Sequence, residues 1–324
     1  MGRIGHIYFH SPCFDGIVSS ALVWDFLENH EDWSTASLHS VNYDARDSWL
    51  STDLQSPSAV VDFLYHPLAG LWADHHETSF LDEGARSHFE ARKSSWLMYN
   101  ERSESCASLL WTRIESSFSY KNPHFDEMIY WADKIDSARY DSVDEAIFGD
   151  APALRIRSSL AQKGAREYSE ELVRSLRSKS IDEVSRLSIV NDRFEQTRAM
   201  TAAGLSRLKQ SATLLSDGII VFDVDASDVI INRYGPYHLF PDARYSIGLV
   251  RTPKGATITA MRNPWREFDS APLGQLFEKL GGGGHQRVAA VFLPEPTADY
   301  SFLLDRIIED VRIHAAEHKT ALVK

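Results

Sequence analysis

Hydrophobic residues along the chain follow two patterns, one typical of strands and one typical of helices. RIGHIYFH, at residues 3–10, alternates β-branched and aromatic residues and predicts a buried strand. The next apolar segment, IVSSALVWDFLEN, predicts an amphipathic helix with Val18, Leu22 and Phe26 on one face. Strand and helix patterns then alternate up to about residue 150. This order indicates an α/β fold with a central parallel sheet and helices on both of its faces.

The same patterns divide the chain into three parts. Residues 1–150 form the expected first domain, and residues 151–215 are helical throughout and predict a connector. Residues 216–324 return to strand patterns and predict a second, smaller α/β domain. Further strands are expected at ASLHSVNY, SPSAVVDF, LAGLWADHH and SSWLMYN in the first domain, and at DGIIVFDV, RYSIGLVRT, GATITAMRN and RVAAVFLP in the second.

Composition is compatible with two folded domains. The chain has 324 residues, of which 43% are hydrophobic, enough to bury a sizeable core. No apolar run reaches the roughly 18 residues that a membrane span needs. The two cysteines, Cys13 and Cys106, give no disulfide framework. We therefore expect a cytoplasmic protein with no membrane partner.

The net charge of −12 bears on which partners are expected. Long duplex nucleic acid binds basic surfaces, so it is not an expected partner. A short anionic substrate stays compatible with this charge if metal ions and a few arginines hold it.

Residues that can bind metal ions stand where predicted elements end. In open parallel sheets, functional groups gather at the carboxyl ends of the strands. Two carboxylates three residues apart on a later helix would share one helical face. The candidates are His10, Cys13 and Asp15 after the first strand, Asp62 and His66 after SPSAVV, Asp74, His75 and His76 after LAGLWA, and Asp133 and Asp136 on the helix.

Each candidate alone has a structural explanation. Asp15 fits a turn or a helix cap, His10 fits a core histidine, and the helical carboxylates fit a solvated face. Together they favour a metal centre, because buried unpaired carboxylates are costly unless a cation holds them. Mixed Asp and His ligands suit Mn²⁺, Mg²⁺ or Zn²⁺, and two ions can share one bridging carboxylate.

The second domain contains a run of four glycines, Gly281–Gly284, followed by His285 and Arg287. A helix C-cap requires one glycine, so the run favours close approach of backbone amides to an anion. Arg262 and Asn263 end a strand upstream of this run. Three nearby aromatic residues are candidates either for base stacking or for the core: Tyr234, Tyr237 and Trp265.

These motifs resemble the DHH phosphoesterase superfamily, and more narrowly its members with a DHHA1 domain. The resemblance covers nearly the whole chain and rests on five motifs in order: the His10–Asp15 loop, Asp62, the Asp74–His76 triplet, the Asp133–Asp136 helix and GGGGH. Relatives include oligoribonucleases, cyclic-dinucleotide phosphodiesterases, single-strand exonucleases and exopolyphosphatase-related proteins.

The resemblance implies a role for each residue. Asp15, Asp62 and His75 would bind metal, with Asp62 bridging two ions, and His76 would face the phosphate. Asp74 would orient a neighbouring imidazole or a water. Asp133 or Asp136 would be the late ligand, and we prefer Asp133 because it follows the apolar MIYWA. The implied clamp for a remote phosphate or 3′ end comprises Gly282, Gly283, Gly284, His285 and Arg287, together with Arg262 and Asn263.

The first motif departs from the family pattern at two positions. Cys13 stands where an Asp is usual, and His10 is displaced by one residue. A thiolate would soften the site and shift it toward Zn²⁺. Cys13 is therefore either a ligand or a structural residue, and both interpretations stay open.

From the resemblance we expect a metal-dependent phosphodiesterase that hydrolyses short oligonucleotides or (cyclic) dinucleotides by a metal-activated water. Two Mn²⁺ ions are expected, with Mg²⁺, Co²⁺ or Zn²⁺ as alternatives. The second domain would close over the site, and a homodimer is allowed. The alternatives are an exopolyphosphatase- or pyrophosphatase-type hydrolase and a non-catalytic nucleotide-binding module.

Overall fold

The computed structural model describes residues 3–31, 33–162 and 164–321. Contacts within the chain divide it into two compact units. The first unit comprises Met1–Tyr140 and Asp150–Glu195, and the second comprises Asp141–Gly149 and Gln196–Lys324. The helices that the sequence analysis assigned to a connector are thus shared between the two units.

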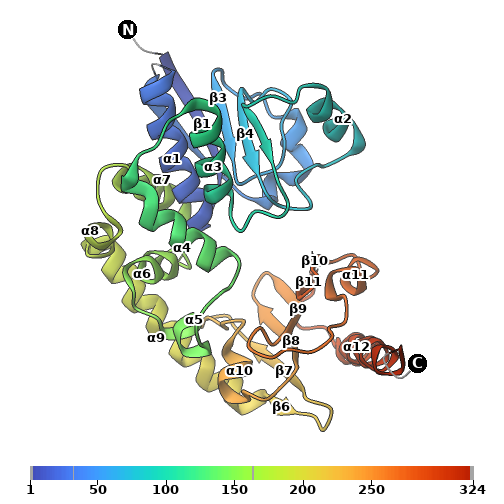
Figure 1. The fold of residues 1–324 in the computed structure, drawn as a ribbon. Helices are drawn as coiled ribbons and strands as arrows, with labels where there is room; N and C mark the ends of the chain where they lie inside the picture. Colours follow the sequence, from blue (N-terminus) through green and yellow to red (C-terminus); the bar gives the residue numbers. More distant parts are fainter. Residues whose placement is uncertain (1–2, 32, 163, 322–324) are drawn as a thin grey trace. The chain divides into compact units, whose positions relative to one another are not determined.

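The first unit contains a five-stranded sheet in the order β2-β1-β3-β4-β5. Its strands β1, β3 and β4 are labelled in Figure 1. Every neighbouring pair of strands is parallel, which confirms the predicted sheet. The carboxyl ends of all five strands therefore lie along the same edge. The strands are β1 (Arg3–His10), β2 (Trp33–Val41), β3 (Ser58–Val61), β4 (Leu71–Asp74) and β5 (Leu97–Tyr99).

Successive strand residues point to opposite sides of this sheet, so both of its faces carry side chains. Helices cover both faces and bury these side chains. Ile7 and Phe9 pack into one core, and Tyr8 packs into another with Trp49 and Trp72. The helices are α1 (Phe14–His30), α2 (Glu83–Ala91), α3 (Cys106–Phe118), α4 (Asp126–Asp136), α6 (Pro152–Ser159), α7 (Ala165–Leu176) and α8 (Ile181–Ser185), with 3-10 turns η1 (Tyr43–Ser51) and η2 (Pro123–Phe125).

Helix α1 differs from its prediction. The sequence analysis expected an amphipathic helix, whereas every residue from Phe14 to Leu27 is buried. The helix contacts α3, α4 and α7 as well as the sheet, so it has no solvent face along this stretch. Its polar residues Ser19, Ser20 and Asp25 are buried with it.

The second unit has a six-stranded mixed sheet in the order β10-β11-β9-β8-β7-β6. Only β7 and β8 pair in parallel; the other neighbours among the described strands are antiparallel. The strands are β6 (Thr213–Leu214), β7 (Ile219–Asp225), β8 (Tyr245–Thr252), β9 (Gly255–Arg262), β10 (Gly283–His285) and β11 (Val288–Leu293). The helices are α5 (Val143–Phe148), α10 (Gly235–Leu239), α11 (Leu273–Glu278) and α12 (Ser301–Ala321), and α9 (Ser188–Ser211) is divided between the units.

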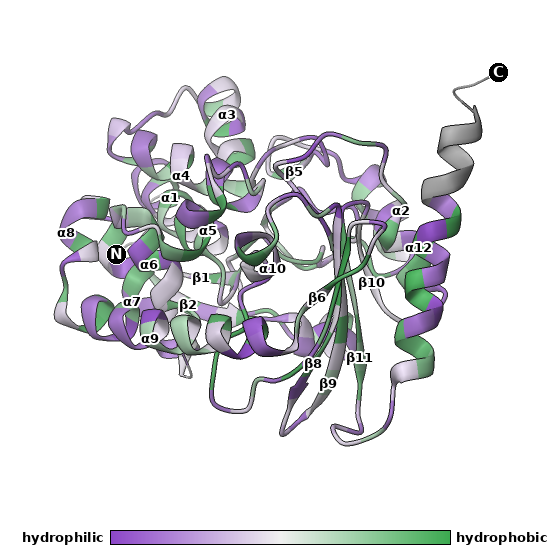
Figure 2. Ribbon diagram, turned by 90° about the horizontal axis from the view of Figure 1, so that it is seen from below, coloured by the Kyte–Doolittle hydropathy of each residue, from purple (hydrophilic) through white to green (hydrophobic). Residues whose placement is uncertain are grey.

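Helix α12 packs against one face of this second sheet. Leu304, Ile307, Ile308 and Val311 recur at helical spacing and join the core of the unit. Figure 2 shows hydrophobic and hydrophilic residues in alternation along this helix. Among the described residues, we find no helix with the length and apolar character of a membrane span.

Candidate metal centre

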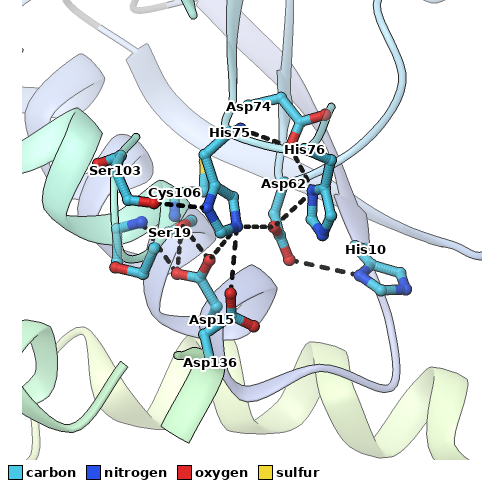
Figure 3. A network of polar contacts seen from close by, with 12 residues as sticks. His10, Asp15, Ser19, Asp62, Asp74, His75, His76, Ser103, Cys106 and Asp136 are labelled. Atoms are coloured by element: carbon cyan, nitrogen blue, oxygen red, sulfur yellow. Dashed lines mark hydrogen bonds and ion pairs between the residues drawn. The ribbon is translucent and has the colours of Figure 1, made fainter. Parts of the chain in front are cut away.

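The candidate metal ligands lie at the carboxyl edge of the parallel sheet (Figure 3). His10 ends β1, Asp62 directly follows β3, and Asp74 ends β4. These three strands are neighbours in the order β1-β3-β4, so residues far apart in sequence meet at one point. The predicted convergence of strand ends thus has a direct structural cause.

Asp62 lies at the middle of this cluster. It is fully buried, and neither of its carboxylate oxygens has a hydrogen-bond partner among the described residues. Its Oδ2 lies 3.4 Å from His10 Nδ1, and its Oδ1 lies 3.9 Å from both His75 Nε2 and His76 Nδ1. Burial alone would raise the pKa of Asp62, but the three histidines hold it below its usual value. Asp62 is therefore a buried carboxylate that stays ionised.

The backbone around Asp62 is also specialised. Asp62 has a φ of 55°, in the left-handed region that Asp tolerates better than most residues. Gly16 lies so close to this segment that a Cβ on Gly16 would be only 2.2 Å from His10 O and 3.1 Å from Asp62 Oδ2. Gly16, directly after Asp15, is therefore required by packing.

His75 is held so that one ring nitrogen faces the carboxylates. Its Nδ1 lies 3.0 Å from Ser103 O, so this nitrogen donates to the carbonyl and Nε2 is left as the lone-pair nitrogen in the neutral ring. Nε2 lies 3.2 Å from Asp136 Oδ2 and 3.7 Å from Asp15 Oδ2. Burial would lower the pKa of His75, but Asp136, Asp15 and Asp62 raise it to about 10. Either a proton or a metal ion can therefore satisfy this nitrogen.

Asp74 orients the second imidazole of the triplet. Its Oδ1 accepts hydrogen bonds from the His75 backbone N–H and from His76 Nδ1, both at 2.8 Å. Its Oδ2 accepts a 2.5 Å hydrogen bond from Ser79 Oγ. Burial would lower the pKa of His76, but the bond to Asp74 and the charge of Asp62 raise it to about 9. The carboxylate of Asp74 is thus fully engaged within the protein, as an orienting residue requires.

Asp15 connects the cluster to helix α3. Its two carboxylate oxygens accept hydrogen bonds from the first backbone amides of that helix, Cys106 N at 2.7 Å and Ala107 N at 2.9 Å. Burial raises the pKa of Asp15 well above its usual value, and the charges of Asp62 and Asp136 raise it further. The helix was expected from SESCASLLWTRIESSF, with Ser105 as a recognisable N-cap, but the contact of its first amides with Asp15 was not foreseen.

Helix α4 brings Asp136, rather than Asp133, to His75. Asp133 accepts a 2.6 Å hydrogen bond from Ser105 Oγ, whereas Asp136 Oδ2 approaches His75 Nε2. The sequence analysis preferred Asp133, and the structure favours the carboxylate one turn later. His66, the further candidate, instead packs its ring at 5.2 Å from Trp49 and accepts from Leu68 N.

Cys13 and His10 form, together with Asp62, another group of candidate ligands in the cluster. Cys13 is half-buried at the N-cap of α1, and burial, together with the nearby carboxylates, raises the pKa of its thiol. Three overlapping groups have ligand atoms within 4.8 Å of one another: His10, Cys13 and Asp62; Asp62, His75 and His76; and Asp15, His75 and Asp136.

These residues fit divalent metal ions. The buried atoms that lack hydrogen-bond partners include His10 Nδ1, His75 Nε2 and both oxygens of Asp62. Such atoms are costly to bury unless a cation compensates them. Asp62 belongs to two of the three groups, which is the arrangement expected of a bridging carboxylate.

Comparison with known proteins identifies the fold. No family model and no curated protein matches the sequence. A pGpG-specific phosphodiesterase from Vibrio cholerae has a TM-score of 0.69 and 18% identity, over 95% of this chain and all of that one. RecJ from Thermus thermophilus in complex with Mn²⁺ has a TM-score of 0.58 and 13% identity, over 98% of this chain and 52% of RecJ. An exopolyphosphatase-related protein from Bacteroides fragilis has a TM-score of 0.53 and 14% identity, over 100% of this chain and 94% of that one.

The chain shares the fold of these three solved structures. The α/β fold expected from the sequence is therefore confirmed. In this fold, the candidate ligands of the first unit converge on Asp62.

The glycine run of the second unit forms part of a hairpin rather than a loop. Gly283–His285 is strand β10, which pairs with β11. Packing explains Gly282 and Gly284, since a Cβ there would lie 2.4 Å from Ala290 O and 2.3 Å from Val288 O. Gly281 and Gly284 also have φ values of 78° and 149°. Gly283 has open space and no such constraint.

Arg262 and Asn263 are buried, and Arg262 holds the segment that follows it while Asn263 holds the segment before β8. Arg262 donates through one terminal nitrogen to Arg266 O and Phe268 O, and Asn263 donates through Nδ2 to Pro241 O and Ala243 O. Arg287 is exposed, and its charge adds to the effect of burial in lowering the pKa of Arg262.

The aromatic candidates in the second unit differ in exposure. Tyr234 and Tyr237 are 1% exposed, and Tyr237 donates a hydrogen bond to Met261 O. Both belong to the core, the second of the two roles considered for them. Trp265 is half-buried and packs at 5.5 Å from Tyr234.

Proposed function

We propose that this chain is a metal-dependent phosphodiesterase that hydrolyses short oligonucleotides or dinucleotides. One observation carries the proposal: Asp62 is buried and ionised, has no hydrogen-bond partner in the part of the chain that the structure describes, and is shared by two groups of ligand-type side chains. Such a carboxylate is suited to hold two cations side by side, and two-metal sites commonly catalyse phosphoryl transfer.

The proposed ligands divide into two sets that share Asp62. Asp15, His75 and Asp136 would hold one ion, and His10, with or without Cys13, would hold the other. We expect Mn²⁺ in both sets, because mixed carboxylate and imidazole ligands suit it and a structural neighbour carries this ion. Zn²⁺ becomes favoured if the Cys13 thiol binds as a thiolate.

Chemistry at such a site would need no nucleophilic side chain. Bound divalent ions would supply an activated water and stabilise the charge on phosphate oxygens. His76, protonated at neutral pH when its pKa is about 9, would donate to a non-bridging phosphate oxygen. Asp74 and Ser79 hold the His76 ring in place for this contact.

The second unit would bind the remote end of the substrate. Arg287 is exposed beside the β10–β11 hairpin, and the backbone at Gly283 has open space around it. We propose that these residues, with His285, bind a phosphate or 3′ end. Arg262 would support them, because its backbone N–H donates a 2.8 Å hydrogen bond to Arg287 O, and Asn263 would hold the adjoining backbone through its own buried hydrogen bonds. Oligoribonuclease activity on very short RNA (nanoRNase activity) and cleavage of pGpG-type dinucleotides both fit this proposal, the second being the activity of a structural neighbour.

A phosphoanhydride hydrolase is the second candidate. The structural likeness to an exopolyphosphatase-related protein favours it. Such an enzyme would be indifferent to nucleobases, so comparison of substrates separates it from a phosphodiesterase.

The test is hydrolysis of labelled pApA, pGpG and polyphosphate with Mn²⁺, Mg²⁺, Co²⁺ or Zn²⁺. We expect Mn²⁺-dependent cleavage of the dinucleotides, with turnover at least about 100-fold lower in His75→Ala. His30→Ala, which changes an exposed histidine at the far end of α1, is the matched control and should keep wild-type activity. Cleavage of polyphosphate alone would favour the second candidate. Nucleotide binding with no turnover on any substrate would indicate a non-catalytic module.

A further inference from the structure

Strand β2 also ends at the carboxyl edge that carries the metal ligands. It pairs in parallel with β1, and its last residue, Val41, lies opposite His10. The chain then enters η1 at Tyr43, where the Asn42 side chain accepts a 2.7 Å hydrogen bond from the Tyr43 backbone N–H. The start of η1 is therefore fixed beside the candidate metal centre.

The ring of Tyr43 lies against one of the proposed ligands. Its centroid is 5.1 Å from the His10 ring and 5.4 Å from the Phe63 ring. The interplanar angles are 69° and 48°, so neither neighbour stacks face to face on it. The residue is 36% exposed, although it adjoins a buried cluster. The protein thus presents a supported aromatic surface next to His10.

The phenol of Tyr43 lies near carboxylates of the candidate metal centre and near the cationic side chain of Arg46. Burial raises the pKa of the Tyr43 hydroxyl, and the charges of Asp74 and Asp62 raise it further. Arg46, three residues along in η1, acts in the opposite direction, so its charge also lies near the phenol. Arg46 is exposed, and its guanidinium has no hydrogen bond or ion pair with other described residues.

An aromatic surface and a free arginine beside a metal centre match a nucleotide. A nucleobase stacks on an exposed aromatic ring, and an arginine binds a phosphate that flanks the base. A polyphosphate chain would use the arginine but would gain nothing from the ring.

We propose that Tyr43 stacks on the nucleobase next to the scissile phosphate and that Arg46 binds a flanking phosphate. This inference rests on the proposed phosphodiester-hydrolysing function and narrows its substrates to base-bearing nucleotides. Tyr43 and Arg46 then determine specificity, and the metal ligands perform their role independently of the base.

The test compares ligands with and without a base. Calorimetry on the Mn²⁺-loaded protein would measure binding of a pApA analogue with a non-hydrolysable phosphonate linkage, and of its abasic counterpart with equal charge. Tyr43→Leu should weaken binding of the base-bearing ligand about tenfold and that of the abasic ligand less than twofold, because only stacking is lost. Tyr43→Phe keeps the ring and should stay within twofold of the wild type for both ligands.

Tyr130→Leu is the matched control, because Tyr130 is 59% exposed on α4 and should leave binding unchanged. Equal weakening for both ligands in Tyr43→Leu would overturn the inference, since Tyr43 would then merely support His10. Unchanged binding of the base-bearing ligand would overturn it as well. A wild type that fails to hydrolyse pApA with any metal would contradict the proposed function, while the binding comparison would still decide the role of Tyr43.

Discussion

At the scale of single residues, the cluster around Asp62 combines charges that would repel one another. Asp15 and Asp62 are both fully buried, and Asp136 adds a third carboxylate beside His75. In the absence of metal, raised pKa values let protons on Asp15, His75 and His76 relieve this repulsion. Metal ions would replace the protons on Asp15 and His75, so metal affinity and proton affinity are coupled here.

Replacing each helical carboxylate separately tests the assignment of the late ligand. Asp136→Asn should weaken Mn²⁺ binding at least about tenfold, because Asp136 lies against His75. Asp133→Asn, its matched control on the same helix, removes a partner of Ser105 and should change Mn²⁺ affinity less than about threefold. Calorimetric titration with Mn²⁺ measures both. A larger loss in Asp133→Asn than in Asp136→Asn would restore the assignment preferred from the sequence.

The histidine pKa values predict how the stability of the metal-free protein depends on pH. Folded-state pKa values of about 10 for His75 and about 9 for His76 lie above the unfolded value near 6.5. Their contribution is therefore fully present below about pH 6.5 and is lost as pH rises through 9 to 10. We expect the free energy of unfolding of chelator-treated protein to fall by several kcal/mol between pH 6.5 and pH 10.

Urea unfolding at a series of pH values measures that decrease. His75→Gln should flatten the pH dependence, because it removes one of the two titrating groups. A metal-free wild type whose stability is the same at pH 6.5 and pH 10 would contradict the coupling.

At the scale of elements, strand ends explain what the sequence could predict. The apolar runs that end in His10, Asp62 and Asp74 are short and bounded by polar residues, so both the strands and their convergence could be inferred. Burial on all sides of α1 could not, because it depends on three helices packing around it. Tyr43 was missed because the candidates at strand ends were chosen as metal ligands, and tyrosine is not one of the usual ligand types.

The glycine hairpin illustrates the same limit. The sequence indicated that the glycines were unusual but could not separate packing from ligand binding. The structure assigns packing or backbone reasons to Gly281, Gly282 and Gly284, and leaves Gly283 unconstrained.

Two alanine substitutions separate these roles. Gly284→Ala should destabilise the protein by about 1–3 kcal/mol, because its Cβ would meet Val288 O and its φ is 149°. Gly283→Ala should stay within about 0.5 kcal/mol of the wild type in urea unfolding. If Gly283 binds the remote phosphate, the same variant should raise KM for pApA severalfold. Equal destabilisation by both variants would contradict the packing assignment.

At the scale of the whole molecule, the fold and the chemistry rest on different observations. The likeness to solved structures spans both units at 18% identity or less, and it establishes the fold alone. The proposed activity depends instead on the few side chains that meet at one edge of the parallel sheet. Their buried, unpartnered atoms are what a metal ion would satisfy.

The most direct test of this account is a calorimetric titration of the metal-free protein with Mn²⁺, beside Asp62→Asn. The account predicts two Mn²⁺ ions per wild-type chain and loss of at least one of them in Asp62→Asn, because Asp62 lies beside both His10 and His75 and is the proposed bridge between the two ligand sets. A wild type that binds no Mn²⁺, or an Asp62→Asn variant that binds it as the wild type does, would contradict the metal centre.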